Sequence, residues 1–526
     1  GSYAGLGATD PNARDIAAYV TVLSGDIGAP GDKSDNSYHV VHGGSTSASA
    51  LLDGFTITDG NANGAAPHDR GGGVHCDDSS SPTLANCTIA GNTASLNGGG
   101  VYCGYFSRPT LTNCDIVNNV ADHGGGLHFY DSSSPTLADC TIAGNLAADG
   151  GGVYCDHSDY HAIPTLTNCT IAQNTAAGSG GGVYGDGYAI LVLTACTIIG
   201  NTAGGDGAGV HGGWYSSLTL TSCSITDNAA GTDGGGVYCG SYADATLTAC
   251  TITDNMASER GAGVCCHCFS AKLTSCALKS NVAGGNGGGV YCDASSLTLV
   301  NSTLADNVGG NGGGVYCEAN PTARLTNCTF TGNAAASKGG GLYRSAISNP
   351  IFTNCILWAN TPQAIYPQGG SMVVTYCDVQ GGWSGTGNID ADPEFAFPDD
   401  PHLLNSSPCI DAGTNSPSGG LPSSDADGLA RVLDGDGDGS TVADMGACEF
   451  DPATPTLALS ATRLTITALT GQTGSRALEI RNSTCGALAW ELHCAADWLT
   501  ADPVAGESAG EVDTVTLTAS TTDLTH

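Results

Sequence analysis

Carboxylates spaced two residues apart form the most ligand-like motif of this chain. Gly439 kinks the loop that carries them, and Met445 occupies the position where an EF-hand loop has its bidentate glutamate. Because alternate carboxylates on such a loop can converge on one hard cation, the motif predicts a structural calcium site, with a solvated acidic turn as the alternative. We expect Asp425 and Asp427 to complete the oxygen shell. The carboxylates of the motif itself are Asp434, Asp436, Asp438 and Asp444.

Cysteines are the second chemically distinctive set, with 24 among 526 residues. So many cysteines are unusual in a reducing compartment, and they predict an extracellular or cell-surface protein. If the repeats stack, neighbouring copies lie about 4.8 Å apart, within the Cα separation that a disulfide accepts. Bridges between copies and a ladder of reduced thiols filling a tight bend are both open. The candidate disulfide cysteines are Cys76, Cys103, Cys87, Cys114, Cys328 and Cys355 in the repeats, and the pairs Cys409 with Cys448 and Cys485 with Cys494.

Soft metal ligands also occur together, at Cys265, Cys266, His267 and Cys268. Successive side chains of a strand point to opposite faces, so four consecutive residues cannot easily surround one tetrahedral ion. We therefore expect packing or local disulfides at this position instead of a zinc site.

Aromatic residues recur one position before most cysteines of the runs such as GGGVYC. We expect them to form an outward strip that could hold sugar rings or another protein. The alternative is that like side chains stack only because the register of the strands forces them to. The tyrosines of this predicted surface strip are Tyr102, Tyr154, Tyr184, Tyr238, Tyr291, Tyr316 and Tyr343.

An eleven-fold repeat positions these residues: a run such as GGGVYC, a variable stretch, and then LTNCTIAGNTA. Its asparagine returns every 26, 27 or 29 residues from Asn92 to Asn360, so the copies stack, and we expect the amides to bond the turn backbone and one another. Alternation of apolar and polar residues indicates three short strands per copy, with Val101, Leu111 and Ile116 in the inward columns. Parallel strands joined without helices predict an all-β parallel β-helix of about eleven to thirteen coils.

Composition divides the chain into four parts. Residues 1–64 lack the repeat, and we expect an N-terminal cap with the first coils, which would protect the strand edges. Residues 65–380 carry the repeats, and residues 381–451 form an Asp-rich closing segment with the predicted calcium loop. Residues 452–526 contain short alternating strands separated by turns, which predicts an immunoglobulin-like sandwich.

The repeats and the closing segment resemble a known group of proteins. The GGG-V-Y and T-I-x-x-N-x-A rungs are similar to repeats of secreted bacterial right-handed parallel β-helix proteins, including polymorphic outer-membrane proteins. The NIDADPEF, SPCIDAG and DMGACEF blocks resemble the closing segment of large β-helix proteins that carry varied C-terminal anchors. This resemblance implies a right-handed helix and secretion, and no agreed activity.

The last part of the chain is similar to BACON-type domains. Such domains usually finish with a further G-T-Y strand pair, which does not occur before His526. We therefore expect an incomplete immunoglobulin-like sandwich. The residues that carry this resemblance are Ala489, Trp490, Asp497, Trp498, Leu499, Pro503 and Gly506.

Charge and hydropathy exclude several partners. The chain has 14 Lys and Arg against 50 Asp and Glu, a formal net charge of −36. Phosphate binding needs clustered cations, so nucleic acid is not an expected partner, and acidic polysaccharides are disfavoured. No apolar run is long enough for a transmembrane segment.

The constant step predicts a non-enzymatic extracellular structural protein, a stiff rod of a cell-surface layer, stalk or fibre. Its expected partners are further copies of itself or other cell-surface components. An adhesin or glycan-binding module is the alternative. A polysaccharide lyase or glycoside hydrolase is the second alternative, but the arginines that could neutralise a uronate do not recur at one position of the coil, and we predict no catalytic residues. These arginines are Arg108, Arg260, Arg324 and Arg344.

Overall fold

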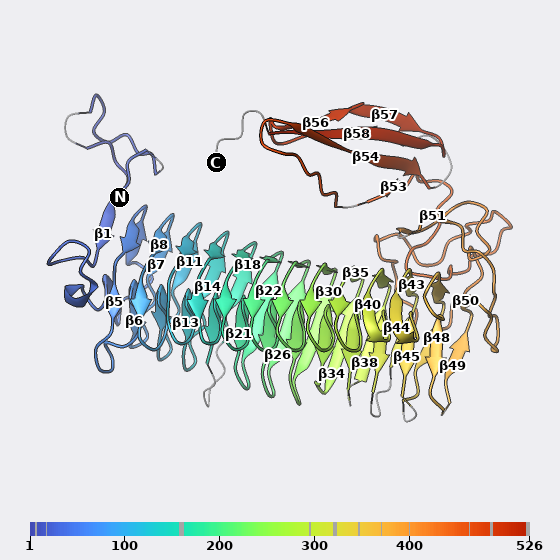
Figure 1. The fold of residues 1–526 in the computed structure, drawn as a ribbon, viewed down its shortest axis with the longest axis horizontal. Helices are drawn as coiled ribbons and strands as arrows, with labels where there is room; N and C mark the ends of the chain where they lie inside the picture. Colours follow the sequence, from blue (N-terminus) through green and yellow to red (C-terminus); the bar gives the residue numbers. More distant parts are fainter. Residues whose placement is uncertain are drawn as a thin grey trace.

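The computed structural model describes residues 1–5, 8–16, 18–156, 163–293, 296–318, 323–345, 348–369, 371–398, 400–461, 463–483 and 488–521. The regular secondary structure of the described residues is β-strand apart from one short 3-10 helix, η1 (Lys33–Asp35), and turns and loops make up the rest. None of its helices is long and apolar enough to span a membrane. Most strands form one elongated solenoid, and the chain then folds back along its side (Figure 1).

Three long parallel sheets form the walls of the solenoid. One has 14 strands among the described residues, from β1 (Val22–Ser24) to β50 (Asp378–Val379), and another has 13, from β3 (Leu51–Asp53) to β49 (Val373–Thr375). The third carries the aromatic column and is named the aromatic sheet. Its 13 strands are, in order, β2 (Val41–Gly44), β6 (Val74–Asp77), β10 (Val101–Cys103), β13 (Leu127–Phe129), β17 (Val153–Cys155), β21 (Val183–Gly185), β25 (Val210–Gly212), β29 (Val237–Cys239), β33 (Val264–Cys266), β37 (Val290–Cys292), β41 (Val315–Cys317), β45 (Leu342–Arg344) and β48 (Ile365–Pro367).

One coil illustrates why the sequence folds in this way. Strands β10, β11 (Thr110–Thr112) and β12 (Asp115–Val117) follow one another, and each pairs in register with its equivalents in the coils before and after. Val101, Leu111 and Ile116 point inward and are completely buried. Burial of each such side chain contributes about 1.5–3 kcal/mol, which favours this register over a shift by one residue. The prediction of an all-β parallel β-helix is confirmed.

A ladder of buried asparagines holds the turn after the third strand. Nδ2 of Asn201 donates to the carbonyl oxygen of Ile171 in the preceding coil and to Oδ1 of Asn228 in the next coil, both at 2.9 Å. Its Oδ1 accepts from the backbone and side-chain nitrogens of Asn174, both at 3.0 Å. The amides therefore satisfy the turn backbone and one another, as the repeated asparagine predicts.

A fourth strand of two residues follows most of these asparagines, and the prediction of three strands per coil missed it. An example is β24 (Thr202–Ala203), which belongs to an eight-stranded parallel sheet from β16 (Leu146–Ala147) to β44 (Ala334–Lys338). Two residues are too few to show a periodic pattern, so alternation alone could not reveal this strand.

Residues 1–64 already contribute strands to the solenoid. Strand β1 pairs with β4 (Thr56–Thr58), and β2, β3 and β4 pair with the strands of the first full repeat. Part of the expected cap is therefore made of coils.

The closing segment packs against the outer face of the 14-stranded sheet. It lies over β43 (Thr329–Thr331) and β47 (Ile356–Trp358), where Ile356 and Met445 belong to one buried apolar cluster. Ile356 and Trp358 occupy outward positions of β47, where the preceding coil has Thr329 and Thr331. Strand β47 therefore has an apolar outer face that needs cover.

Arg431 of the closing segment is buried where that segment meets the solenoid, and it bonds to both. Arg431 Nη1 lies 2.7 Å from Glu449 Oε1, and both side chains are fully shielded from solvent. The other terminal nitrogen of Arg431 donates to Asn301 Oδ1 at 2.8 Å. Because removing one partner would leave a buried charge unpaired, this contact specifies how the segment docks.

The C-terminal part contains two small antiparallel sheets that pack through Trp490. Its ring is 8% exposed and contacts a cluster with Leu478 and Val515 of the larger sheet. An immunoglobulin-like sandwich remains a prediction for this part. The larger sheet has the strands β53 (Leu457–Leu459), β54 (Thr473–Asn482), β58 (Val512–Ser520) and β56 (Leu499–Asp502), and the smaller has β55 (Leu488–Glu491) and β57 (Ala505–Ser508).

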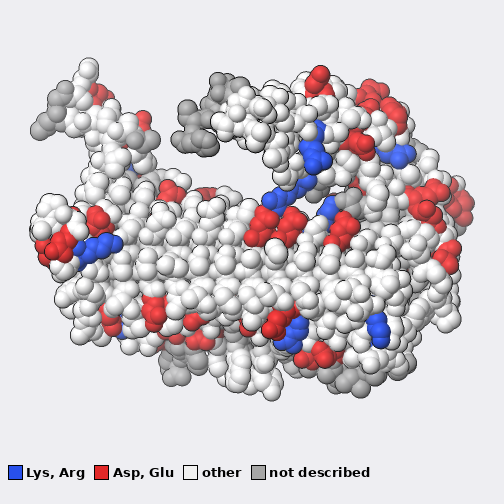
Figure 2. Space-filling model, in the orientation of Figure 1, with Lys and Arg blue, Asp and Glu red and all other residues white. Residues whose placement is uncertain are grey.

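The larger C-terminal sheet lies alongside the solenoid, directed back toward its N-terminal half (Figure 1). Arg463 forms ion pairs with Asp227 at 2.7 Å and Asp254 at 2.8 Å, which belong to two successive coils. Figure 2 shows that the flat wall of the solenoid carries few charges in this view and that the charged side chains gather along its margins.

Candidate functional site

The predicted surface strip is a stack of rings. Ring centroids of Tyr154 and Tyr184 lie 4.8 Å apart, and those of Tyr316 and Tyr343 lie 4.7 Å apart. The predicted exposure, however, is wrong for most members, and Tyr102 and Tyr291 are only 0% and 1% exposed. We name this stack the aromatic file. It consists of His75, Tyr102, His128, Tyr154, Tyr184, His211, Tyr238, Tyr291, Tyr316, Tyr343 and Tyr366.

Stacking and a close glycine turn explain this burial. Each ring covers the faces of its neighbours, so little more than edges and hydroxyl groups can reach solvent. The first glycine of each triplet covers the base of the ring: at Gly180 (φ +69°), an added Cβ would lie 2.5 Å from Cβ of Tyr184. A sugar therefore cannot stack on the faces of the file.

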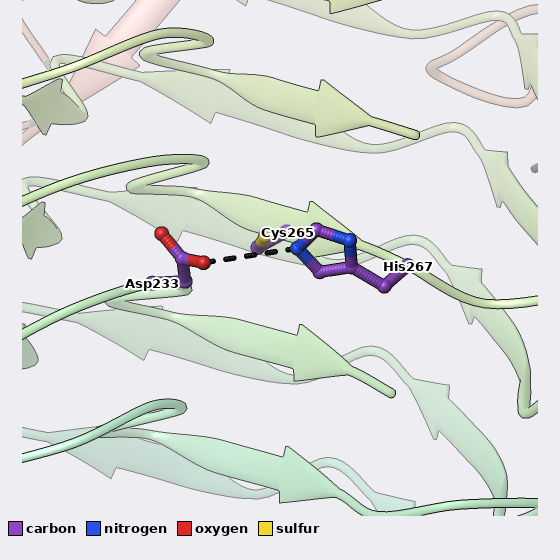
Figure 3. Close-up of side chains that lie close together, drawn as sticks. All are labelled: Asp233, Cys265 and His267. Atoms are coloured by element: carbon purple, nitrogen blue, oxygen red, sulfur yellow. Dashed lines mark ion pairs between the residues drawn. The ribbon is translucent and has the colours of Figure 1, made fainter. Parts of the chain in front are cut away.

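The file is interrupted at Cys265, which pairs in register with Tyr238 and Tyr291 on the neighbouring strands. His267, two residues later, fills the space: its ring centroid lies 5.9 Å from that of Tyr238 and 5.5 Å from that of Tyr291. Figure 3 shows His267 beside Cys265 and directed toward Asp233 of the preceding coil. His267 thus takes the place of the missing tyrosine ring.

Asp233, Cys265 and His267 form what we name the file cluster. One ligand atom from each lies within 4.8 Å of the other two, and Nε2 of His267 lies 3.7 Å from Oδ2 of Asp233. Arg260 already occupies both oxygens of this carboxylate, with Nη2–Oδ2 at 2.9 Å and Nε–Oδ1 at 3.2 Å. Burial alone would raise the pKa of Asp233, but His267 and Arg260 outweigh it and lower that pKa. A guanidinium group thus neutralises the carboxylate internally.

A second, exposed ladder of rings follows the aromatic sheet and was missed in the sequence. Tyr188, Tyr215 and Tyr242 stack at 4.9 and 5.0 Å, each at a turn residue with positive φ. Their exposed fractions are 41%, 46% and 61%, and that of Trp214 is 66%. Tyr188, Trp214 and Tyr215, with Asp186 and parts of the aromatic file, line a hollow of about 560 Å³. The available signal was a tyrosine five residues after the inward valine in three consecutive repeats.

The predicted calcium ligands do not all converge. Asp434 and Asp436 lie together, and the structure adds Asp411, with one oxygen of each within 4.8 Å of the others. Oδ2 of Asp411 accepts from the backbone nitrogens of Gly435 and Asp436 at 2.9 and 2.8 Å. Oδ1 of Asp434 is shielded from solvent and has no hydrogen-bond partner among the described residues. These three carboxylates are the part of the predicted site that could hold a hard cation.

The other predicted ligands have separate roles. Asp438 accepts from the backbone nitrogen of Ser440 on its own turn. Asp444 and Asp425 are buried, and their oxygens accept backbone hydrogen bonds that hold the closing segment. Asp427 lies beside His402. Sequence spacing could not separate these roles, because all six aspartates occur in one acidic stretch.

The cysteines of the repeats form columns that point into the solenoid, as predicted. The candidate cysteines among the described residues are thiols. Cys409 and Cys448 face different carboxylates: Cys409 Sγ donates to Asp378 at 3.4 Å, and Cys448 Sγ lies within 4.8 Å of a carboxylate oxygen of Asp427. The predicted bridge between them is therefore not formed in the structure. Cys485 lies outside the described residues, so its pairing with Cys494 remains a prediction. The candidates of the columns, all thiols here, are Cys76, Cys103, Cys87, Cys114, Cys328 and Cys355.

Comparisons with known proteins place the fold. A family described as the right-handed beta helix region matches residues 34–163, 151–310 and 288–389, which together span more than half of the chain. The search of curated proteins finds no match to this chain. The crystal structure of pectate lyase Pel9A is 12% identical, covers 77% of this chain and 98% of that chain, and gives a TM-score of 0.33. That likeness is too low to carry an argument about activity. The family match shows that the chain belongs to the right-handed β-helix family.

Proposed function

We propose that this protein is a non-enzymatic extracellular structural element, a stiff rod of a cell-surface layer, stalk or fibre. The observation that carries the proposal is the unbroken register of three parallel sheets with 13 or 14 described strands each. Every coil is bonded to its neighbours along all walls and through the asparagine ladder, so bending would have to break many bonds together.

Two further features support an extracellular rod. The chain has 24 cysteines, a number that is unusual for a protein of a reducing compartment. The carboxylates of Asp411, Asp434 and Asp436 are suited to calcium, which would stabilise the closing segment outside the cell. A BACON-like C-terminal domain would act as a spacer or as a second point of attachment.

The test is assembly of the full chain. Sedimentation velocity and electron microscopy at rising concentration, with and without calcium, are expected to show ordered end-to-end or lateral contacts between rods. Matched incubations with polyuronates and neutral glycans would be assayed for sugar release. Strictly monomeric rods that release sugar would overturn the proposal in favour of an enzyme.

Glycan binding is a second candidate, favoured by the exposed ladder and its hollow. Exposed aromatic rings pack well against the apolar faces of sugars, and the carboxylate of Asp186 offers hydrogen-bond acceptors. The net charge of −36 favours neutral glycans. Trp214→Ala should weaken binding to a neutral-glycan array by about tenfold. Phe269→Ala, an equally exposed ring outside the hollow, is the matched control.

A further inference from the structure

Three different kinds of metal ligand meet where the closing segment contacts the solenoid. Strand β52 (Asp400–Leu403) pairs with β51 (Phe395–Phe397) and carries His402, whose Nε2 lies 3.0 Å from Oδ2 of Asp427. The Cys448 thiol lies close to the same carboxylate. One ligand atom from each of these three residues lies within 4.8 Å of the other two. We name them the closing cluster.

These separations suit a tetrahedral ion of the zinc class. Zinc bonds of about 2.0–2.2 Å to nitrogen and oxygen and about 2.3 Å to sulfur place neighbouring ligand atoms roughly 3.3–3.7 Å apart. The distance between His402 and Asp427 would have to open by only about 0.3 Å. Imidazole, thiolate and carboxylate are common zinc ligands, whereas calcium takes oxygen ligands.

The second nitrogen of His402 is held in the way that zinc sites require. Nδ1 forms a hydrogen bond to the carboxylate of Asp400 on the same strand. In metal sites a carboxylate at this position fixes the ring orientation and the tautomer, and leaves Nε2 free to bind the ion. Asp400 is therefore a positioning residue of the cluster.

We propose that His402, Asp427 and Cys448 bind one zinc-class divalent cation, with Asp400 positioning the imidazole. The cluster lies between interior and solvent, because the Asp427 side chain is 46% exposed while Cys448 is 3% exposed. On binding, the thiol proton of Cys448 passes to solvent and the thiolate bonds the metal ion, while His402 binds through the unprotonated Nε2 of the tautomer that Asp400 holds.

The three residues of the closing cluster line a hollow. This hollow has a volume of about 420 Å³ and is lined by the closing cluster, Thr251, Thr253, Lys279 and the first strand of the C-terminal part. A zinc ion with three protein ligands and an open position holds water or another oxygen ligand there. Thr251, Thr253 and Lys279 line the same hollow, and their hydroxyl and ammonium groups would favour an oxygen ligand with negative charge.

Cobalt substitution in the full, reduced chain tests this proposal. After chelator treatment and dialysis, Co²⁺ titration is expected to give one ion per chain, the visible absorption of tetrahedral Co²⁺ and a thiolate-to-cobalt band in the near ultraviolet. Cys448→Ser should abolish the thiolate band and weaken binding more than about 100-fold, and Asp400→Asn should weaken it by about 10–100-fold. Cys409→Ser and Cys265→Ser, which alter thiols outside the cluster, should retain the spectrum.

Several outcomes would overturn the proposal. They are an octahedral cobalt spectrum without a thiolate band, an unchanged band in Cys448→Ser, or loss of the band in Cys265→Ser instead. Peptide mapping without reduction that finds a Cys409–Cys448 disulfide in the secreted protein would also refute it. Circular dichroism verifies that each variant folds. Should Cys448→Ser fail to fold, the spectrum of the unmodified chain and the Asp400→Asn titration decide the matter.

Discussion

The file cluster and the closing cluster contain the same three kinds of side chain, yet their surroundings give them different chemistry. Each combines aspartate, cysteine and histidine with ligand atoms within 4.8 Å. In the file cluster Arg260 bonds both oxygens of Asp233, so a cation is already built into the site. In the closing cluster the nearest charged partner of His402 is a second carboxylate, Asp400.

The comparison shows that ligand type and spacing alone do not define a metal site. The file cluster maintains the aromatic stack where cysteine replaces tyrosine, and Arg260 pairs with its carboxylate Asp233. In the closing cluster two carboxylates face the imidazole, no arginine among the described residues forms an ion pair with Asp427, and one side is open to a hollow. Neighbouring charge therefore decides which of the two would attract a cation.

Acidification should have the largest effect, and it probes the aromatic file that the first cluster maintains. Burial lowers the pKa of His211 to about 4, although Asp206, Asp149 and Asp186 oppose the shift. The unfolded chain binds this proton near pH 6.5, so the contribution of His211 to stability is full above about pH 6.5 and is lost as the pH drops toward 4, by about 3 kcal/mol. Urea unfolding between about pH 7.5 and 4.5 should reveal the loss.

His211→Tyr restores the residue found in most coils and should reduce this acid sensitivity. Burial also lowers the pKa of His128 well below its usual value, so His128 should cause the acid sensitivity that remains in this variant. If acidification lowers the unfolding free energy of His211→Tyr and of the unmodified chain equally, the aromatic file is not the source of that loss.

Zinc should stabilise the chain through one cluster only. At free zinc of about 100 times the dissociation constant, binding to the folded state adds about 2.7 kcal/mol. We expect thermal unfolding of the unmodified chain and of His267→Ala to shift upward with zinc, and that of His402→Ala to remain unchanged. A shift lost in His267→Ala and retained in His402→Ala would reverse the comparison.

Removing Arg260, the internal cation, should convert the file cluster into a metal-binding site. Arg260→Gln leaves Asp233, whose side chain is 6% exposed, without its strongest partner, and should cost about 1–2 kcal/mol of unfolding free energy. The variant should also bind a second Co²⁺ ion with a thiolate band. Arg108→Gln, at an exposed arginine, is the control. Failure of Arg260→Gln to gain cobalt would mean that geometry, and not charge, excludes the metal.

The smallest effect should come from rebuilding the file. Cys265→Tyr combined with His267→Asp reproduces the V-Y-C-D pattern of β17 and β37 with the residue that follows each strand. Because a tyrosine ring then replaces the histidine ring, we expect stability to change by less than about 1 kcal/mol. Chemical unfolding measures this difference, and a much larger loss would assign the cluster a role beyond packing.

The repeated parts of the molecule could be predicted well from sequence, because every coil repeats the same evidence. The inward positions of Val101, Leu111 and Ile116 follow from alternation and from a constant step. The burial of Tyr102 does not follow, because an outward side chain of an isolated strand becomes buried only when equal rings stack above and below it.

The two clusters could not be predicted, because their members are distant in sequence and only partly repetitive. Asp233 reaches Cys265 from the loop of the preceding coil. His402 and Asp427 lie 25 residues apart in a segment without periodicity. Asp427 was assigned to calcium because of its acidic neighbours. Only the folded chain brings a thiol and an imidazole to that carboxylate.

The asparagine ladder has a mechanical consequence. Each amide, such as that of Asn201, bonds to the coil before and the coil after, so opening one interior coil leaves unsatisfied groups on both sides. Disassembly should therefore unzip inward from the two ends. A domain docked across several coils near one end, as the closing segment is, then acts as a latch on one of the two points where unravelling can begin.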